Sequence, residues 1–182
     1  MPDSAHDRIL ERRDSLIGKP VIRPNARRLV TGRGRYADDV KLPRMVHAAF
    51  LRSPYAHARI KGIDSAAALA MPGVTHVFAG KDLAAICKPW VGVLNHLKGL
   101  KSATQYPMAI DRACWQGEPV AAVLAASRAE AEDAVEKIEV DWEVLAPFTD
   151  PVAAAEPGSP VLHPELGDNI AIEMKHDIGD WD

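Results

Sequence analysis

The stretch that decides the fold runs from Arg27 to Leu83 and reads RRLVTGRGRYADDVKLPRMVHAAFLRSPYAHARIKGIDSAAALAMPGVTHVFAGKDL. Its middle holds two apolar runs of the length that strands have. We predict a buried strand over residues 45–51 and a second strand over residues 57–63, because Ser53-Pro54-Tyr55 between them breaks regular structure. The middle of the stretch is therefore predicted to form two short strands joined by a turn.

A helix and a third strand follow this pair. Asp64 suits the N-cap of a helix over residues 65–71, since its short side chain can accept a hydrogen bond from a free N–H group of the first turn. Pro72-Gly73 ends this helix. Residues 74–78 are then predicted to form the third strand.

The pattern is clearest between residues 119 and 144. Residues 119–125, PVAAVLA, form a short apolar run that predicts a buried strand. Ser127 and Glu130 have the spacing of a capping box, which predicts a helix that begins after Ser127. Apolar and acidic residues then alternate over residues 138–144, which is typical of a half-buried strand with an acidic outer face.

Together these elements predict an α+β fold with a mixed sheet and two main helices in a single domain. We expect an N-terminal arm at residues 1–26, the folded domain at residues 27–155 and a Pro/Gly-rich tail at residues 156–182. Residues 87–112 fit neither the helical nor the strand period, so we predict a long loop there. Within the tail, apolar and other residues alternate over 170–175 as in a strand.

The composition is that of a globular protein, with 47% hydrophobic and 26% charged residues. No stretch approaches the ~20 apolar residues that a membrane-spanning helix needs. The polar start has no apolar signal region, so we expect a cytoplasmic location. Cys87 and Cys114 are too few for an iron–sulfur cluster, which generally takes four cysteine ligands.

Charge is distributed unevenly along the chain. Residues 1–112 hold 19 basic and 9 acidic residues, whereas residues 113–182 hold 3 and 16. The basic residues are dispersed among apolar ones and form no Lys/Arg block, so we expect no nucleic-acid partner. The alternative is a surface whose two halves face each other or face partners of opposite charge.

Several sequence blocks, taken in order, carry a resemblance to a known family. They are GRGRYADDV at 32–40, FLRSPYAHA at 50–58, MPGV at 71–74, GEPVA at 117–121, and AEDA at 131–134 followed by IEVDWE at 138–143. The chain resembles the N-terminal α/β hammerhead domain of the large, molybdenum-binding subunit of the xanthine dehydrogenase, aldehyde oxidase and carbon monoxide dehydrogenase family. The resemblance covers about residues 19–182.

This resemblance implies a part in a molybdenum hydroxylase, which hydroxylates an aldehyde or an N-heterocycle, or oxidises carbon monoxide. In the family, the molybdopterin cofactor and the catalytic glutamate belong to later domains, so the chain is expected to bind no cofactor and not to be catalytic alone. The implied partners are a chain that binds the molybdenum cofactor, an iron–sulfur subunit with [2Fe–2S] clusters, and a flavin subunit with FAD. The resemblance leaves open whether the chain is a natural split subunit or a fragment of a longer one.

Two turns are the candidate interface with such partners. Arg52 and Tyr55 border the Ser-Pro-Tyr turn at a strand end, where another domain can dock. Gln116, Gly117 and Glu118 lead into the apolar strand at residues 119–125. A buried Glu118 needs a partner, either an arginine of this chain or a group of the cofactor domain or substrate channel. The rival to this account is a stand-alone binding or regulatory module with the same fold.

Other chemistry-bearing residues are better explained by structure. His47 and His57 flank the Ser-Pro-Tyr turn and are expected to make one hydrogen bond each. Asp38-Asp39 is expected to lie in a turn, since adjacent residues of an extended chain point to opposite faces. Gly32-Arg33-Gly34 lacks the rest of a phosphate-binding motif. The acidic residues of 139–143 are expected to line a solvated or interface face.

Overall fold

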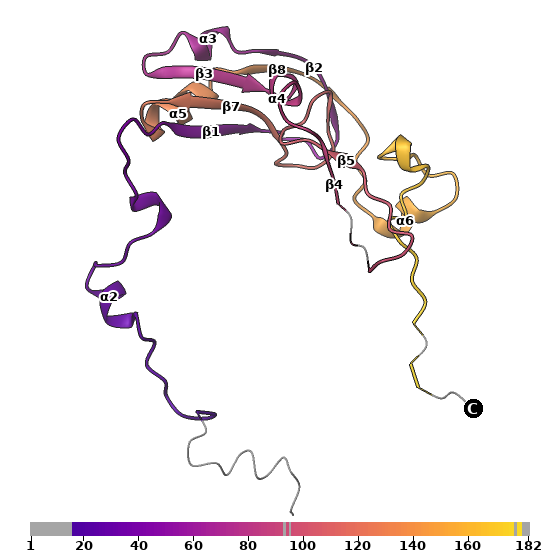
Figure 1. The fold of residues 1–182 in the computed structure, drawn as a ribbon. Coiled ribbons are helices and arrows are strands. Elements are labelled where there is room, and N and C mark those ends of the chain that lie inside the picture. Colours follow the sequence, from indigo (N-terminus) through magenta and orange to yellow (C-terminus); the bar gives the residue numbers. More distant parts are fainter. Residues whose placement is uncertain (1–15, 93, 95, 177, 180–182) are drawn as a thin grey trace, which may run out of the picture. The chain divides into compact units, whose positions relative to one another are not determined.

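The computed structural model describes residues 16–92, 94, 96–176 and 178–179, and the chain divides into two compact units, residues 1–44 and 45–182 (Figure 1). The first unit contains α2 (Ala26–Val30) and the 3-10 turn η1 (Ala37–Asp39). The Asp39 carboxylate accepts a hydrogen bond from the Tyr36 backbone N–H at 2.9 Å, which confirms the predicted turn. Of the predicted arm at residues 1–26, residues 1–15 lie outside the described residues.

The first sheet of the second unit is built around β7 (Pro119–Ala125), with β1 (His47–Arg52) on one side and β3 (Val74–Ala79) on the other. Both ladders are antiparallel. The strand β7 is buried along most of its length because it has a neighbour on each side and the helix α5 packs on one face of the sheet. This explains why its sequence is an uninterrupted apolar run.

The second sheet is built around β2 (Ala58–Asp64), with β8 (Glu139–Val144) and the short β6 (Arg112–Ala113) as its antiparallel neighbours. Ion pairs between exposed side chains link β2 to β8: Arg59 lies 2.9 Å from Glu143, and Lys61 lies 3.0 Å from Asp141. The acidic face of β8 is therefore paired within the sheet, in agreement with the prediction of a solvated face.

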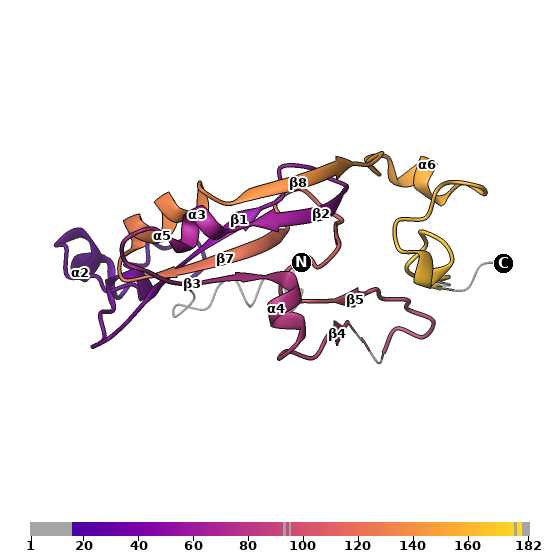
Figure 2. The ribbon, with the colours of Figure 1, turned by 90° about the horizontal axis from the view of Figure 1, so that it is seen from above.

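The two helices α3 (Ala66–Leu69) and α5 (Arg128–Val135) lie side by side (Figure 2). Helix α5 packs on β1, β7 and β3. The buried residues form two clusters, and Leu51, Ile63 and Val140 pack against both of them. The two sheets and α5 therefore share one continuous core, made mainly of Ala, Val and Ile side chains.

The helix ends follow the predicted capping in part. The Ser127 hydroxyl accepts a hydrogen bond from the Glu130 N–H at 3.3 Å, which is the first of the two bonds of a capping box. The Glu130 carboxylate accepts a hydrogen bond from the Ser127 hydroxyl at 2.8 Å, whereas a complete box takes the Ser127 backbone N–H. At α3 the N-cap is Ser65, while the Asp64 carboxylate accepts a hydrogen bond from the Ala66 N–H at 2.9 Å. Helix α3 is shorter than the helix predicted over residues 65–71: it ends at Leu69, and Ala70 is its C-cap.

Residues 80–112, which contain the predicted long loop, hold short elements. Helix α4 (Gly80–Ala84) is followed by β4 (Trp90–Val91) and β5 (Thr104–Gln105), which pair in an antiparallel ladder. A Cβ atom at Gly80 would collide with the backbone of Ala109, so α4 can approach this segment only because residue 80 is glycine. Local sequence periodicity does not predict two-residue strands.

The C-terminal segment is held by side-chain contacts rather than by strand pairing. It contains α6 (Pro151–Ala155) and the 3-10 turn η2 (Pro164–Leu166). The Asn169 side chain bonds the backbone at Ala154, Pro160 and Leu162. Lys101 binds the segment twice, through its Nζ to the Asp168 carboxylate at 2.6 Å and through its N–H to the Ala171 carbonyl at 2.8 Å.

Two expectations are revised. The α+β class is confirmed, but the described strands divide among three sheets whose ladders are all antiparallel, where we expected a mixed sheet. The strands divide in this way because β2 and β3, which are consecutive in sequence, join different sheets. The predicted strand over 170–175 is wrong, since the structure assigns no strand to residues 170–176. The Asp168 carboxylate instead accepts a hydrogen bond from the Ile170 N–H in a local turn at 3.0 Å.

Candidate partner interface

The two turns predicted as an interface are joined by backbone hydrogen bonds. The Ser53 N–H donates to the Glu118 carbonyl at 2.8 Å, and the Gly117 N–H donates to the Ser53 carbonyl at 2.8 Å. Gly117 has φ +88°, a left-handed conformation that glycine adopts without strain. The end of β1 and the start of β7 therefore form one hydrogen-bonded frame, which brings Arg52, Gly117 and Glu118 together.

Arg52 reinforces this frame and remains exposed. Its guanidinium donates a hydrogen bond to the Gly117 carbonyl at 2.9 Å and lies 5.9 Å from the centre of the Phe50 ring. The ladder between β1 and β7 shifts register between Leu51 and Arg52. A bulge of this kind redirects the side chains at the end of a strand, so the exposed guanidinium has a defined position.

Tyr55 is held by the neighbouring turn. The Ser53 hydroxyl accepts a hydrogen bond from the Tyr55 N–H at 3.1 Å and donates one to the Tyr55 carbonyl at 2.8 Å. The Tyr55 ring meets Trp142 of β8 edge to face, with ring centres 5.7 Å apart. Because the side chain is still 37% exposed, Tyr55 offers a fixed aromatic surface to another chain.

Glu118 is the buried charge of the site, with 8% of its surface exposed. Its carboxylate accepts a hydrogen bond from the Cys114 N–H at 2.6 Å, so its partner is backbone rather than the arginine that the sequence suggested. Burial raises the pKa of Glu118, against the lowering effect of the Cys114 and Trp115 N–H groups and of the Arg112 charge. The carboxylate closes the turn that leads into β7.

Gln116 and Trp115 are the outer residues of the second turn. Both are exposed, and the Trp115 side chain is 50% accessible. Of these two residues, only Gln116 belongs to the interface predicted from the sequence. A tryptophan beside a turn glycine is a signal in its own right, since exposed tryptophan is enriched at the energetic centres of protein interfaces.

A hollow of about 290 Å³ lies beside this frame. Its lining includes Tyr106, Arg112, Cys114, Trp115 and Glu118. Burial raises the pKa of the Cys114 thiol, against the opposite effect of the Arg112 charge. A raised pKa lowers the thiolate fraction, and the thiolate is the nucleophilic form of cysteine.

His57 anchors the segment that leaves β8. Its Nδ1 lies 2.8 Å from the Ala146 carbonyl, and the ring packs against Phe148 with centres 5.5 Å apart. That contact requires the proton on Nδ1, and the buried Nε2 finds no partner among the described residues. His47 lies in β1, where it is the ladder partner of Ala125 of β7. The His57 contact agrees with the expected single hydrogen bond.

The described part of the chain brings together no group of three or more His, Cys, Asp or Glu side chains that could hold a metal ion. None of the described helices has the length and apolar character required to cross a membrane.

Comparison with known proteins gives consistent matches. The family described as "Aldehyde oxidase and xanthine dehydrogenase, a/b hammerhead domain" matches residues 31–146. The nicotine 6-hydroxylase large subunit of Paenarthrobacter nicotinovorans is 39% identical over 168 residues, which are 92% of this chain and 20% of that protein. The carbon monoxide dehydrogenase large chain of Afipia carboxidovorans is 41% identical over 143 residues, which are 79% of this chain and 17% of that protein.

A solved structure agrees with these matches. Quinoline 2-oxidoreductase from Pseudomonas putida 86 superposes with a TM-score of 0.76 at 42% identity, over 83% of this chain and 19% of that one. The chain thus spans about a fifth of the length of the proteins that it matches.

Proposed function

The chain belongs to the aldehyde oxidase and xanthine dehydrogenase family through its hammerhead domain, and we propose that its role is architectural within a molybdenum hydroxylase. In this role it shapes one side of the molybdenum-binding part of the enzyme and docks neighbouring domains or subunits. Oxidative hydroxylation of an aldehyde or N-heterocycle, or oxidation of carbon monoxide, is then an activity of the whole complex.

The cofactors are proposed to lie outside residues 1–182. The relatives include a xanthine dehydrogenase molybdenum-binding subunit of Escherichia coli, which this chain matches over 18% of that subunit's length. We propose that a molybdopterin-type cofactor is bound by the rest of the large subunit or by a partner chain. We place [2Fe–2S] clusters and FAD in further subunits. A cytoplasmic location of this assembly stays a prediction.

The observation that carries the docking role is the hydrogen-bonded frame of the two turns. It presents Arg52, Tyr55 and Trp115 at the surface on backbone whose hydrogen bonds are already made. Arginine, tyrosine and tryptophan dominate the energetic centres of interfaces. Because the frame is preorganised, little conformational entropy remains to be lost when a partner binds.

The test uses an exposed residue of the frame, so that folding is preserved. Trp115→Ser, expressed in the native host, is expected to weaken association with the molybdenum-containing partner about tenfold or more. Trp90→Ser is the matched control, since Trp90 is 61% exposed on β4. The readout is the molybdenum and partner protein recovered with the tagged chain at rising salt.

Three outcomes are distinguishable. Loss of the partner with Trp115→Ser but not with Trp90→Ser supports the docking role. Equal recovery with both variants would contradict a role of this frame. A native chain that binds neither molybdenum nor any partner chain would overturn the proposal and favour a stand-alone binding or regulatory module.

A further inference from the structure

Residues 16–44, which we call the arm from here on in place of the predicted arm at residues 1–26, expose most of their large apolar side chains. The structure describes all of these residues, and none of them is buried. The large apolar residues with at least 43% of their surface exposed are Leu16, Ile17, Val21, Ile22, Val30, Tyr36, Val40 and Leu42. Single exposed apolar residues are ordinary, whereas eight within one short segment mark a surface that another molecule covers.

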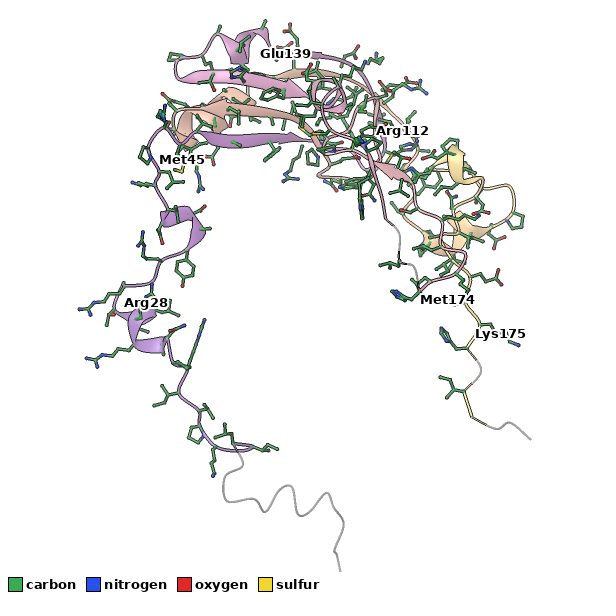
Figure 3. All side chains as sticks on the ribbon, in the orientation of Figure 1. Arg28, Met45, Arg112, Glu139, Met174 and Lys175 are labelled. Atoms are coloured by element: carbon green, nitrogen blue, oxygen red, sulfur yellow. The ribbon has the colours of Figure 1, made fainter. Side chains whose placement is uncertain are left out.

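The arm is also strongly basic. It contains eight Lys and Arg residues but only two acidic residues, Asp38 and Asp39. Arg27, Arg28 and Arg33 line a shallow hollow of about 650 Å³ together with Pro24 and Thr31. The Nε of Arg28, which is labelled in Figure 3, donates a hydrogen bond to the Arg33 carbonyl at 2.9 Å, and this bond holds the Arg28 side chain against the backbone of the arm. The arginine fork suits carboxylate oxygens, which it binds in pairs.

We infer that the arm docks on an acidic protein surface that lies outside residues 1–182 and has apolar hollows between its carboxylates. This inference rests on the proposed function, because it supposes an enzyme in which this domain has neighbours. Basic and apolar residues are interspersed along the whole arm, so its partner must offer both chemistries over the same length. Complementary charge then positions the arm and apolar contact stabilises it.

Two other classes of partner fit less well. A membrane-surface segment needs a helix with one apolar face, but the α-helix of the arm has five residues and Pro20, Pro24 and Pro43 interrupt the rest. A single-stranded nucleic acid needs aromatic side chains on which bases stack, and Tyr36 is the only aromatic residue of the arm. The aliphatic residues of the arm have no counterpart on a phosphate backbone.

Zero-length cross-linking provides the first test, on the assembled enzyme from the native host. A carbodiimide couples lysine amines to carboxylates that touch them, and the arm carries Lys19 and Lys41. We expect links from these lysines to Asp or Glu residues outside residues 1–182. Links that end only within residues 113–182, in the same or a second copy, would overturn the inference.

Trypsin provides the second test, since it cleaves after the arginines of an accessible arm. Cleavage at Arg33 and Arg35 is expected to be about tenfold or more slower in the assembly than in the isolated chain. The double variants Arg27→Glu/Arg28→Glu and Ile22→Ser/Val30→Ser are each expected to remove most of this protection. Lys88→Glu/Lys137→Glu and Val152→Ser are the matched controls, since all three residues are exposed outside the arm.

The results separate this inference from the proposed function. An assembly that forms while the arm is cleaved as fast as in the isolated chain refutes the inference and leaves the proposed function intact. If no assembly forms with the native chain, both fail. Arm protection by a single-stranded oligonucleotide or by vesicles containing anionic lipid, but not by the assembly, would assign the arm to those partners instead.

Discussion

At the scale of single residues, Glu118 combines two opposing effects in one side chain. Burial disfavours its charged form, while the backbone N–H groups of the turn favour that form, and the net effect is a raised pKa. The folded protein therefore holds a proton that the unfolded chain has already released, in the range between the ordinary value of 4.5 and the raised value. Within that range, the free energy of unfolding falls as the pH rises.

Glu118→Gln removes this titration while keeping an oxygen that can accept the Cys114 N–H. We expect the variant to gain stability relative to the native chain as the pH rises above about 4.5, and to keep that gain at neutral pH. Urea unfolding at pH 4, 5, 6 and 7 measures the difference, with Glu132→Gln on the exposed side of α5 as the control. A difference that does not change with pH would show that Glu118 titrates normally.

Gly73 is the second residue with a sharp local requirement. It has φ +79°, and a Cβ atom there would collide with the Glu130 carboxylate, which holds the Ser127 cap of α5. Gly73→Ala is expected to cost about 2–3 kcal/mol, from left-handed strain and a disturbed cap. Gly99→Ala isolates the strain alone, about 1–2 kcal/mol, since Gly99 has φ +82° with no atom within 4 Å of its Cβ position. Equal losses in urea unfolding would exclude the contact with Glu130.

At the scale of elements, α5 connects the local sequence to the core. Its N-cap is specified by Ser127 and Glu130, and its buried residues Ala131 and Ala134 are small enough to bring the helix close to the first sheet. A close helix buries the apolar face of β7, which is the central strand of that sheet. The start of α5 therefore influences the stability of the whole second unit.

Ser127→Ala removes the hydroxyl that accepts the Glu130 N–H, so we expect a loss of about 1 kcal/mol in the free energy of unfolding. Ser65→Ala is the matched control, because Ser65 is the N-cap of α3 but makes no side-chain cap bond, and should change stability by less than about 0.5 kcal/mol. Equal effects of the two substitutions in thermal or urea unfolding would contradict the capping role of Ser127.

These elements also show what sequence alone can and cannot predict. The alternation over residues 138–144 and the Ser127–Glu130 box are local signals, and both produced the expected element. Sheet membership is not local: Arg59 of β2 meets Glu143 of β8 across 84 positions of sequence, so nothing near β2 indicates its sheet. The Gly117 turn was predictable from its own residues. The Cys114 N–H that Glu118 binds lies only four positions away, but no pattern of residue types indicates that bond or the exposure of Trp115.

At the scale of the whole molecule, the uneven charge is partly neutralised inside the second unit. Arg59, Lys61 and Lys101 from the basic part of the sequence pair with Glu143, Asp141 and Asp168 from the acidic part. The arm adds eight basic residues to one end of the chain. The frame of the two turns and the arm thus give the chain two surfaces suited to neighbours, one aromatic and preorganised, the other basic and apolar.

The central claim is that this chain works as the hammerhead domain of a molybdenum hydroxylase. The most direct test is to purify it through an affinity tag from its native host, identify every polypeptide recovered with it, and measure molybdenum and iron by elemental analysis. The account predicts molybdenum in a fixed ratio to the tagged chain, together with the remaining molybdenum-binding polypeptide and an iron-containing subunit. A folded chain recovered without molybdenum and without those polypeptides would contradict the account.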